Sequence, residues 1–268
     1  MDLHLKGKTA LITGASKGIG LAVAHAFARE GCHLHLTARS GSALEAIKAE
    51  ITAEHDISVH IHVFDLCVSG NIVKLAQQAR GCDILINNAG DVPSGPIESL
   101  TEADWRRGYD LKLFGYISLT REIYAQMKAR GDGVIINDIG NSGENWDANY
   151  IAGSTGNAAL MAFTKALGGQ SLDFGVRVVG VNPGPVETER MLKINKRRAF
   201  DMYGDESRFE ELRAMYPGGR PATADEIADL ILFLASPRAA YITGTVVTID
   251  GGIASRGSII KPRTLNNA

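Results

Sequence analysis

Three glycines near the amino end of the chain have the spacing of a phosphate-binding turn. They follow a short apolar run, Thr9–Thr13, in the pattern Gly-x3-Gly-x-Gly, and apolar residues then recur at helical spacing over 19–30. Glycine lets the backbone turn tightly and approach a diphosphate, while the free N–H groups at the start of a helix attract the anion. The pattern predicts a dinucleotide-binding turn. Its predicted cofactor residues are Gly14, Ser16, Lys17, Gly18, Ile19 and Gly20.

The charge after the second predicted strand indicates which dinucleotide is bound. An acidic residue at this point would hold the adenosine ribose and repel a 2′-phosphate. The run His33–Thr37 is followed instead by Ala38 and Arg39, and Lys17 adds a cation inside the glycine turn. Both cations can pair with a 2′-phosphate. We therefore predict NADP(H) in preference to NAD(H); the alternative is that both are solvated surface residues.

Short apolar runs alternate along the chain with stretches of helical periodicity. This repetition predicts an α/β fold in which about seven strands form one parallel sheet, covered by helices on both faces. We expect a single domain over residues 1–268. Hydroxyl residues placed three positions before an acid predict helix starts at Ser42, Thr101 and Thr223. The predicted strands are Thr9–Thr13, His33–Thr37, Val59–Asp65, Ile84–Asn87, Val134–Ile139, Arg177–Asn182 and Thr245–Ile249.

Composition argues against several classes of partner. The formal net charge is -2 and the charges are interspersed, so no basic face is available for nucleic acid. No apolar stretch is long enough to span a bilayer, and we expect a cytoplasmic protein without a membrane partner. The three cysteines are far apart, which predicts buried free thiols. Histidine pairs at two-residue spacing indicate strand faces, and we predict no metal site.

Four segments carry a resemblance to a known family. They are Thr13-Gly14-x3-Gly18-x-Gly20, Asn87-Asn88-Ala89-Gly90, Asn182-Pro183-Gly184-Pro185-Val186-Glu187-Thr188, and Ile242-Thr243-Gly244 leading to Asp250-Gly251-Gly252. Their order makes the chain, from Leu5 to about Gly252, resemble the short-chain dehydrogenase/reductase family. The resemblance implies a Rossmann-type doubly wound sheet and hydride transfer between a nicotinamide and a carbonyl or alcohol carbon. It also implies the remaining cofactor residues: Asp65 with its neighbour Leu66 at the adenine, Asn88, Ala89 and Gly90 at its ribose, and Pro183, Gly184, Val186 and Thr188 at the nicotinamide.

A tyrosine exchanges the proton in this family, and a lysine four residues later lowers its pKa. Tyr150 matches the tyrosine, whereas Ser154 stands where the lysine is expected. Helical spacing would place the two side chains on one face, but a hydroxyl supplies no positive charge. We predict Tyr150 as the proton donor or acceptor, and we include Ser154 in the catalytic site.

Lys112 departs from the family pattern in the opposite direction. It occupies the position of an asparagine that belongs, in the family, to the same proton relay as the missing lysine. We predict that Lys112 directs its ammonium toward Tyr150 and takes over the electrostatic task. The alternative is a lysine whose ammonium reaches solvent from an interface helix.

The serine that orients the substrate oxygen in the family is also missing. Alignment of the fifth predicted strand places Gly140 at that position, and the loop between it and Tyr150 is shorter than usual. Ser142 is the nearest hydroxyl, and we predict it as the substitute donor. The alternative is an ordinary loop serine.

The segment over about 187–218 lacks the strand pattern and is rich in charged, methionine and aromatic residues. We predict that it covers a small-molecule carbonyl or alcohol substrate, although its apolar residues could equally pack against one another. Its basic residues either meet an anionic substrate or form a solvated face. They are Lys193, Lys196, Arg197 and Arg198.

Three functions remain open on this basis. The first is an NADP(H)-dependent oxidoreductase with a rearranged proton relay. The second is a catalytically degenerate sensor or scaffold that binds NADP(H), and a non-redox family variant that uses Tyr150 as an acid is a third. The family resemblance implies a homodimer or homotetramer.

Overall fold

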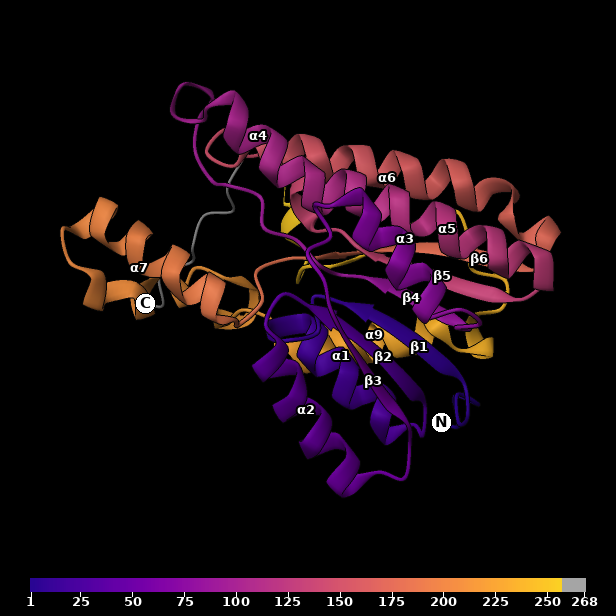
Figure 1. The fold of residues 1–268 in the computed structure, drawn as a ribbon. Coiled ribbons are helices and arrows are strands. Elements are labelled where there is room, and N and C mark those ends of the chain that lie inside the picture. The colour runs from indigo at the N-terminus through magenta and orange to yellow at the C-terminus, as the bar shows by residue number, and fades with distance from the viewer. Residues whose placement is uncertain (257–268) are drawn as a thin grey trace.

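Seven parallel strands form the central sheet of the computed structural model, which describes residues 1–256. Their order is β3-β2-β1-β4-β5-β6-β7, so the chain reverses its direction of travel across the sheet between β3 and β4 (Figure 1). This is the predicted doubly wound sheet, and the predicted number of strands is confirmed. The strands are β1 (Thr9–Thr13), β2 (His33–Ala38), β3 (Val59–Val63), β4 (Ile84–Asn87), β5 (Gly133–Asp138), β6 (Val176–Pro183) and β7 (Thr245–Ile249).

Helices cover both faces of the sheet (Figure 1). Every residue of β6 is buried and six of the eight are valine, glycine or proline, as expected of a strand that is covered on both sides. One face carries α1 (Gly18–Arg29), α2 (Gly41–Glu54) and α9 (Ala224–Ala235), whose apolar residues form one buried cluster with β1 and β2. The other face carries α3 (Ser69–Gln78), α5 (Gly115–Arg130) and α6 (Ile151–Ser171).

The helical stretch before β5 is not one uniform helix. It consists of α4 (Glu102–Tyr109), a π-helical turn over Asp110–Phe114, and α5. A π-helical turn inserts an extra residue and rotates the side chains that follow it, and such turns are frequent at functional sites. Here the turn contains Lys112.

Two of the three predicted helix starts are confirmed. Thr101 and Thr223 each form a capping box with the acid three residues later. The third is wrong, because α2 has already begun at Gly41 and its cap is Ser40, whose hydroxyl accepts from the Ala43 N–H. The cap and the helix start are therefore two residues earlier than the Ser42 pattern indicates.

Buried amides join the central strands below their carboxyl ends. The Asn87 side chain on β4 donates to Thr120 on α5 at 3.0 Å and to Asn137 on β5 at 2.9 Å. Asn137 donates in turn to Thr164 on α6 at 2.9 Å. Because buried polar groups are costly unless paired, this chain of bonds fixes α5 and α6 against the two strands.

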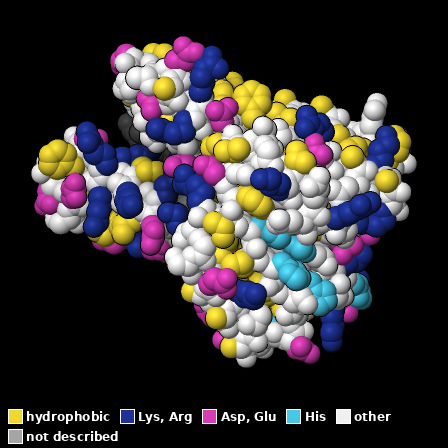
Figure 2. All heavy atoms as spheres, in the orientation of Figure 1, with side chains coloured by type: hydrophobic (Ala, Val, Ile, Leu, Met, Phe, Trp, Pro, Cys, Tyr) yellow, Lys and Arg dark blue, Asp and Glu magenta, His cyan; other side chains and the backbone are white. Residues whose placement is uncertain are grey.

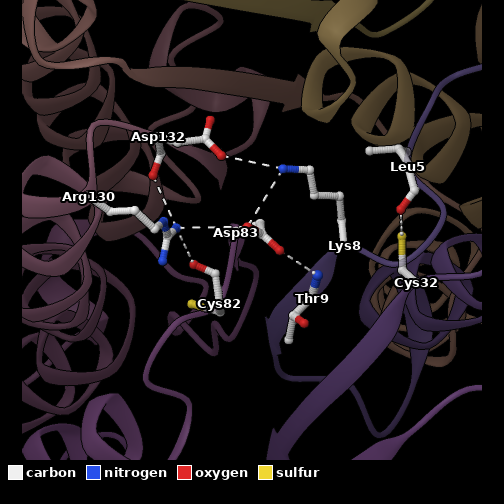
Figure 3. A network of polar contacts seen from close by, with 8 residues as sticks. All are labelled: Leu5, Lys8, Thr9, Cys32, Cys82, Asp83, Arg130 and Asp132. Atoms are coloured by element: carbon white, nitrogen blue, oxygen red, sulfur yellow. Dashed lines mark hydrogen bonds and ion pairs between the residues drawn. The ribbon is translucent and has the colours of Figure 1, made fainter.

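A second polar network lies at the opposite, amino ends of β1 and β4 (Figure 3). The Asp83 carboxylate accepts from the Thr9 N–H at 2.8 Å and pairs with Lys8 at 3.7 Å and Arg130 at 3.9 Å. Arg130 also donates to the Cys82 carbonyl, and Lys8 reaches Asp132. This network is far from the ends of the strands where a ligand binds in such sheets, so we assign it a structural role.

The cysteine prediction holds for two of three residues. Cys32 and Cys82 are buried free thiols, and the Cys32 thiol contacts the Leu5 carbonyl at 3.2 Å (Figure 3). Cys67 is exposed, because it lies in the turn after β3 and not on a strand or in a helix core.

Three of the four strand histidines stack on one another, and Figure 2 shows histidine side chains gathered on this face of the molecule. The ring of His35 on β2 lies against those of His60 and His62 on β3, and His35 Nδ1 is 2.8 Å from His62 Nε2. Burial lowers the pKa of His35 to about 4, and the neighbouring histidines act in the same direction. Within residues 1–256 no group of three potential ligands could hold a metal ion, and no helix is long and apolar enough to cross a membrane.

The segment predicted to cover the substrate stands away from the sheet (Figure 1). It contains α7 (Glu189–Tyr203) and α8 (Phe209–Arg213), connected by short turns. Several of its apolar side chains are on the surface, including Phe200 and Met202, which are 52% and 58% exposed. The rest of the predicted domain, residues 257–268, lies outside the described residues.

Candidate functional site

A large pocket of about 2310 Å³ opens at the carboxyl ends of the strands. Ligands bind at this edge of doubly wound sheets, where the direction of the chain reverses. On the face shown in Figure 2, Lys and Arg side chains gather where the α7 region meets the rest of the molecule. The structure brings to this pocket all but two of the site residues predicted from sequence; the two that do not line it are Gly20 and Ser154.

The glycine turn is held directly against the end of β4. Gly14 and Gly18 have φ of +67° and +59°, which side-chain-bearing residues rarely adopt. Gly20 is needed for a different reason, because a Cβ there would lie 2.5 Å from the Asn88 amide nitrogen and would overlap the Gly14 carbonyl. Gly20 therefore shapes the turn from behind the pocket wall.

Thr13 is a residue of this turn to which the sequence reasoning gave no role. Its hydroxyl accepts from the Asn88 N–H at 2.8 Å and the Ala89 N–H at 3.0 Å, and it donates to the Ile86 carbonyl. The Asn88 amide donates back to the Thr13 carbonyl at 2.8 Å. Thr13 thus joins the two segments that the family resemblance assigns to the diphosphate and the adenine ribose.

The cations predicted to select the cofactor both line the pocket and are exposed there. Within the described residues, neither Lys17 nor Arg39 forms an ion pair with a carboxylate. Asp65 lies in the same part of the pocket, and its carboxylate accepts from the Cys67 N–H at 3.0 Å. Leu66 beside it is buried. The guanidinium and ammonium are therefore available to an anionic group.

The predicted nicotinamide segment forms the opposite wall. Gly184 packs so closely on β7's end that a Cβ would lie 2.7 Å from Asp250, and its N–H donates to the Ile249 carbonyl. Thr188 is the N-cap of α7, and its methyl group would lie 3.5 Å from a Cβ at Gly18. The segment therefore returns to face the glycine turn, as the resemblance implies. Pro183 and Val186 also line the pocket.

Lys112 projects from the π-helical turn into the pocket. Its ammonium donates to the Ile139 carbonyl just after β5, and its stem lies so close to Gly90 that a Cβ there would be 2.9 Å from Lys112 Cδ. Burial lowers the pKa of Lys112 to about 8, nearby Arg190 acts in the same direction, and Asp138 opposes it. Burial likewise raises the pKa of Asp138 to about 6.

The structure does not show the predicted contact between the Lys112 ammonium and Tyr150 within the described residues. No hydrogen bond joins the two side chains within residues 1–256, because the ammonium is held by the Ile139 carbonyl. The cation that contacts the Tyr150 hydroxyl is Arg190, whose Nη2 donates to it at 3.3 Å. A part for Lys112 in proton transfer stays a prediction.

Tyr150 lines the pocket from a position just before α6. It is the N-cap of that helix, with φ −135° and ψ 39°. Sequence spacing was expected to place Tyr150 and Ser154 on one helix face; this is wrong, because Tyr150 precedes the helix. Ser154 is buried outside the pocket, where its hydroxyl accepts from the Asp147 N–H at 3.2 Å and supports the preceding loop.

Gly153, which is buried under the Tyr150 ring, and Asn157, which lines the pocket, are two residues that the sequence reasoning missed. A Cβ on Gly153 would overlap the Tyr150 ring, so the ring occupies the space of a side chain at 153. Asn157, one turn later, donates to the Gly140 carbonyl at 3.3 Å and to the Ser142 hydroxyl at 2.8 Å. Ser142 therefore lies in the pocket, as predicted, with Asn157 as its partner.

The spacing from Gly140 was the signal that could have found these two residues. Gly153 lies about a dozen residues after Gly140, which is the family interval between serine and tyrosine, and Asn157 follows four residues later. In that register the serine, tyrosine and lysine positions hold Gly140, Gly153 and Asn157, and the loop needs no shortening. Tyr150 then reaches the tyrosine's place from a position three residues earlier.

Comparisons with known proteins agree with the fold. A family model described as short chain dehydrogenase matches residues 8–199. The 3-oxoacyl-[acyl-carrier-protein] reductase FabG of Aquifex aeolicus is 30% identical over 264 residues, which cover 94% of this chain and 100% of that protein. Galactitol 2-dehydrogenase (L-tagatose-forming) of Cereibacter sphaeroides is 33% identical, with 93% and 96% covered.

A solved structure extends this likeness to three dimensions. L-sorbose reductase from Gluconobacter frateurii, complexed with NADPH and L-sorbose, superimposes with a TM-score of 0.88 at 31% sequence identity. The match covers 94% of this chain and 98% of that one.

Proposed function

The chain belongs to the short-chain dehydrogenase/reductase family, and on that premise we propose that it transfers a hydride between NADP(H) and the carbonyl or alcohol carbon of a small molecule. The observation that carries the proposal is the presence, in one pocket, of the glycine turn, Arg39 and Tyr150. This pocket has room for a dinucleotide and a substrate together, since sites for drug-sized ligands alone occupy roughly 300–1,000 Å³.

NADP(H) is proposed because of the charge around the adenosine end of the pocket. Arg39 and Lys17 have no carboxylate partner within the described residues, so a 2′-phosphate would meet two available cations. The glycine turn fits the diphosphate, because its backbone approaches where a Cβ would intrude. The similar L-sorbose reductase is complexed with NADPH.

Tyr150 is proposed as the group that exchanges the proton. When bound, the nicotinamide would supply or accept the hydride. In the reduction direction the Tyr150 hydroxyl gives its proton to the substrate oxygen, and in oxidation the phenolate receives it. Ser142, whose hydroxyl accepts from the Asn157 amide, would donate a hydrogen bond to the same oxygen. Ser154 contributes indirectly by fixing the loop that ends at Tyr150.

Lys112 is proposed to add positive charge beside this site. Its ammonium lies at the Ile139 carbonyl, next to Gly140, where the family serine is absent. A half-buried cation there stabilises negative charge that develops on a substrate oxygen. We propose that the α7 segment covers the substrate and that the protein acts as a homodimer or homotetramer in the cytoplasm.

A screen of carbonyl and alcohol substrates with NADPH and NADH tests this function. We expect at least one small carbonyl compound to oxidise NADPH, which is measured as a loss of the absorbance of the reduced nicotinamide. NADH should be much less effective. Equal rates with both nicotinamides would contradict the roles of Lys17 and Arg39. Tight NADPH binding without turnover on any substrate would contradict hydride transfer.

The second candidate function is a sensor or scaffold that binds NADP(H) without turnover. The specific observation in its favour is that Gly140, Gly153 and Asn157 stand at the family's serine, tyrosine and lysine positions. Retention of a tyrosine ring over Gly153 favours the enzyme. Turnover in Tyr150→Phe distinguishes the two: an enzyme oxidises NADPH as the wild type and loses this activity in the variant, whereas a sensor binds NADPH in both proteins and oxidises it in neither.

A further inference from the structure

Arg190 connects the three segments that surround the proton-transfer end of the pocket. It lies in the first turn of α7, and its Nη2 donates to the Val92 carbonyl at 2.8 Å and to the Tyr150 hydroxyl at 3.3 Å. Val92 belongs to the loop that follows β4, and Tyr150 precedes α6. One side chain of the covering segment thereby fixes the tyrosine to the wall of the pocket.

The place of the Tyr150 ring depends on Gly153. The ring fills the space that any side chain at 153 would occupy, so the ring could not lie there if 153 carried a Cβ. The neighbouring backbone holds the same segment, because the Gly95 N–H donates to the Asn149 carbonyl at 2.8 Å and Gly95 bridges to Tyr150. Tyr150 is therefore seated by backbone contacts on one side and by Arg190 on the other.

The charges around Tyr150 leave Arg190 as the cation in contact with it. Lys112 is bound to the Ile139 carbonyl, with Asp138 beside it. Tyr116 of α5 faces Tyr150 but donates to the Asp138 carbonyl at 3.0 Å, and its burial raises its pKa well above the ordinary value. In the preceding loop, Asp147 pairs with Arg198 at 3.8 Å. Arg190 itself pairs with no carboxylate within the described residues.

We propose that Arg190 is the positioning residue of the acid–base group: it orients the Tyr150 hydroxyl and stabilises its phenolate, the task that the family assigns to the missing lysine. This inference rests on the proposed function. In reduction the Tyr150 O–H bond breaks, the proton goes to the substrate oxygen, and the electron pair stays on the phenolate beside the guanidinium. Water returns the proton. Because Arg190 belongs to the covering segment, the acid–base group is complete only when that segment is in place.

The ionisation of Tyr150 tests this role without turnover. The near-ultraviolet phenolate absorbance is titrated in the full-length protein and in its Tyr150→Phe variant, and the difference is the Tyr150 signal. The same pair is made with Arg190→Gln, Arg190→Lys and Arg121→Gln. We expect Arg190→Gln to move the Tyr150 midpoint up by about one pH unit, since an adjacent opposite charge favours the ionised form.

The lysine variant and the control separate charge from structure. Arg190→Lys keeps the charge and should show a smaller upward shift than Arg190→Gln. Arg121 is an exposed residue of α5 that pairs with adjacent Glu122, and its replacement should leave the midpoint unchanged. An unchanged midpoint in Arg190→Gln would overturn the proposal. So would an equal shift in the lysine and glutamine variants, which would indicate a structural effect alone.

Kinetics supply the second readout. With an active substrate, Arg190→Gln should lower kcat about tenfold and move the pH profile of kcat/KM toward alkaline pH, with NADPH affinity retained. Gly153→Ala should produce the same pattern by displacing the ring. If the wild-type protein turns over no substrate, the proposed function fails, whereas the titration still decides whether Arg190 controls Tyr150. Wild-type kinetics in an active Arg190→Gln protein would overturn the inference alone.

Discussion

The two ends of the pocket differ in whether backbone or side chains shape them. At the proposed cofactor end the backbone conformation is decisive: Gly14 and Gly18 adopt positive φ, Gly20 has no room for a Cβ, and the Thr13 hydroxyl binds the residues that follow β4. At the other end, where we propose proton transfer, Gly140, Gly153 and Asn157 stand at the family's serine, tyrosine and lysine positions, and the proposed functional groups come from other segments. Tyr150 comes from before α6, and Arg190 comes from the covering segment.

This difference indicates which part of the site tolerates change. A turn that needs glycine at defined positions cannot be rebuilt from another segment, because close approach and positive φ belong to the backbone. A proton donor needs only a hydroxyl at one point in space, and a side chain from a neighbouring position can supply it. The glycine turn thus requires glycines at defined positions of the sequence, whereas the proposed proton donor requires only that a hydroxyl lie at the right place in the pocket.

The largest effect is expected for Tyr150→Phe. Removal of the hydroxyl should lower kcat about 10²–10⁴-fold, because the proton donor is lost, while the dissociation constant for NADPH stays close to wild type. Steady-state kinetics and a fluorescence titration with NADPH measure the two quantities. A rate within a few-fold of wild type would show that the proton-transfer end does not depend on Tyr150.

The second largest effect is expected for Arg39→Ala, on the affinity for NADPH. Loss of a charge-assisted contact to a 2′-phosphate should weaken NADPH binding roughly tenfold to a hundredfold and leave NADH binding nearly unchanged. Isothermal titration with both nucleotides measures this. Arg29→Ala, on the exposed side of α1, is the control and should change neither affinity. Equal losses for NADPH and NADH would contradict a 2′-phosphate contact.

A pH-dependent effect is expected from Lys112. Its folded pKa of about 8 lies below the ordinary value of 10.5, so between these values the unfolded chain binds the proton more tightly. The folded protein should therefore become more stable as pH rises from about 8 to 10.5. This group should lower the equilibrium constant for unfolding by at most about tenfold per pH unit.

Urea denaturation across this window compares the wild-type protein with Lys112→Met. The variant should lack the Lys112 contribution, so its stability should rise less, or fall more, with pH than that of the wild type. Parallel pH dependence in the two proteins would contradict the lowered pKa of Lys112.

The smallest expected effect is on the free energy of unfolding, and it compares a residue that caps a helix with one that does not. Thr101→Ala removes a capping box of α4 and should cost about 1 kcal/mol of unfolding free energy. Ser42→Ala removes a hydroxyl of the same predicted pattern that caps nothing, and should be nearly neutral. Chemical denaturation of both variants measures the difference, and equal losses would contradict the assignment of Ser40 as the cap.

The sequence was sufficient for the sheet and the cofactor turn because these depend on local patterns. Seven apolar runs gave seven strands, with ends that differ by two residues or fewer, and the glycine spacing placed the turn. Gly153 and Asn157 were missed because Tyr150, three residues before Gly153, was matched to the family's tyrosine position. Arg190 had no local signal at all, since its contact with Tyr150 joins residues forty positions apart in the chain.

Transfer of deuterium from labelled reduced NADP to a carbonyl substrate tests the central claim most directly. The protein is incubated with NADPH that carries deuterium at the transferable position, and the product is examined by mass spectrometry. We predict that the label appears on the alcohol carbon with the wild-type protein, and at a rate reduced about 10²–10⁴-fold with Tyr150→Phe. A product that forms without the label, or NADPH that binds and transfers deuterium to no substrate, would contradict hydride transfer by this site.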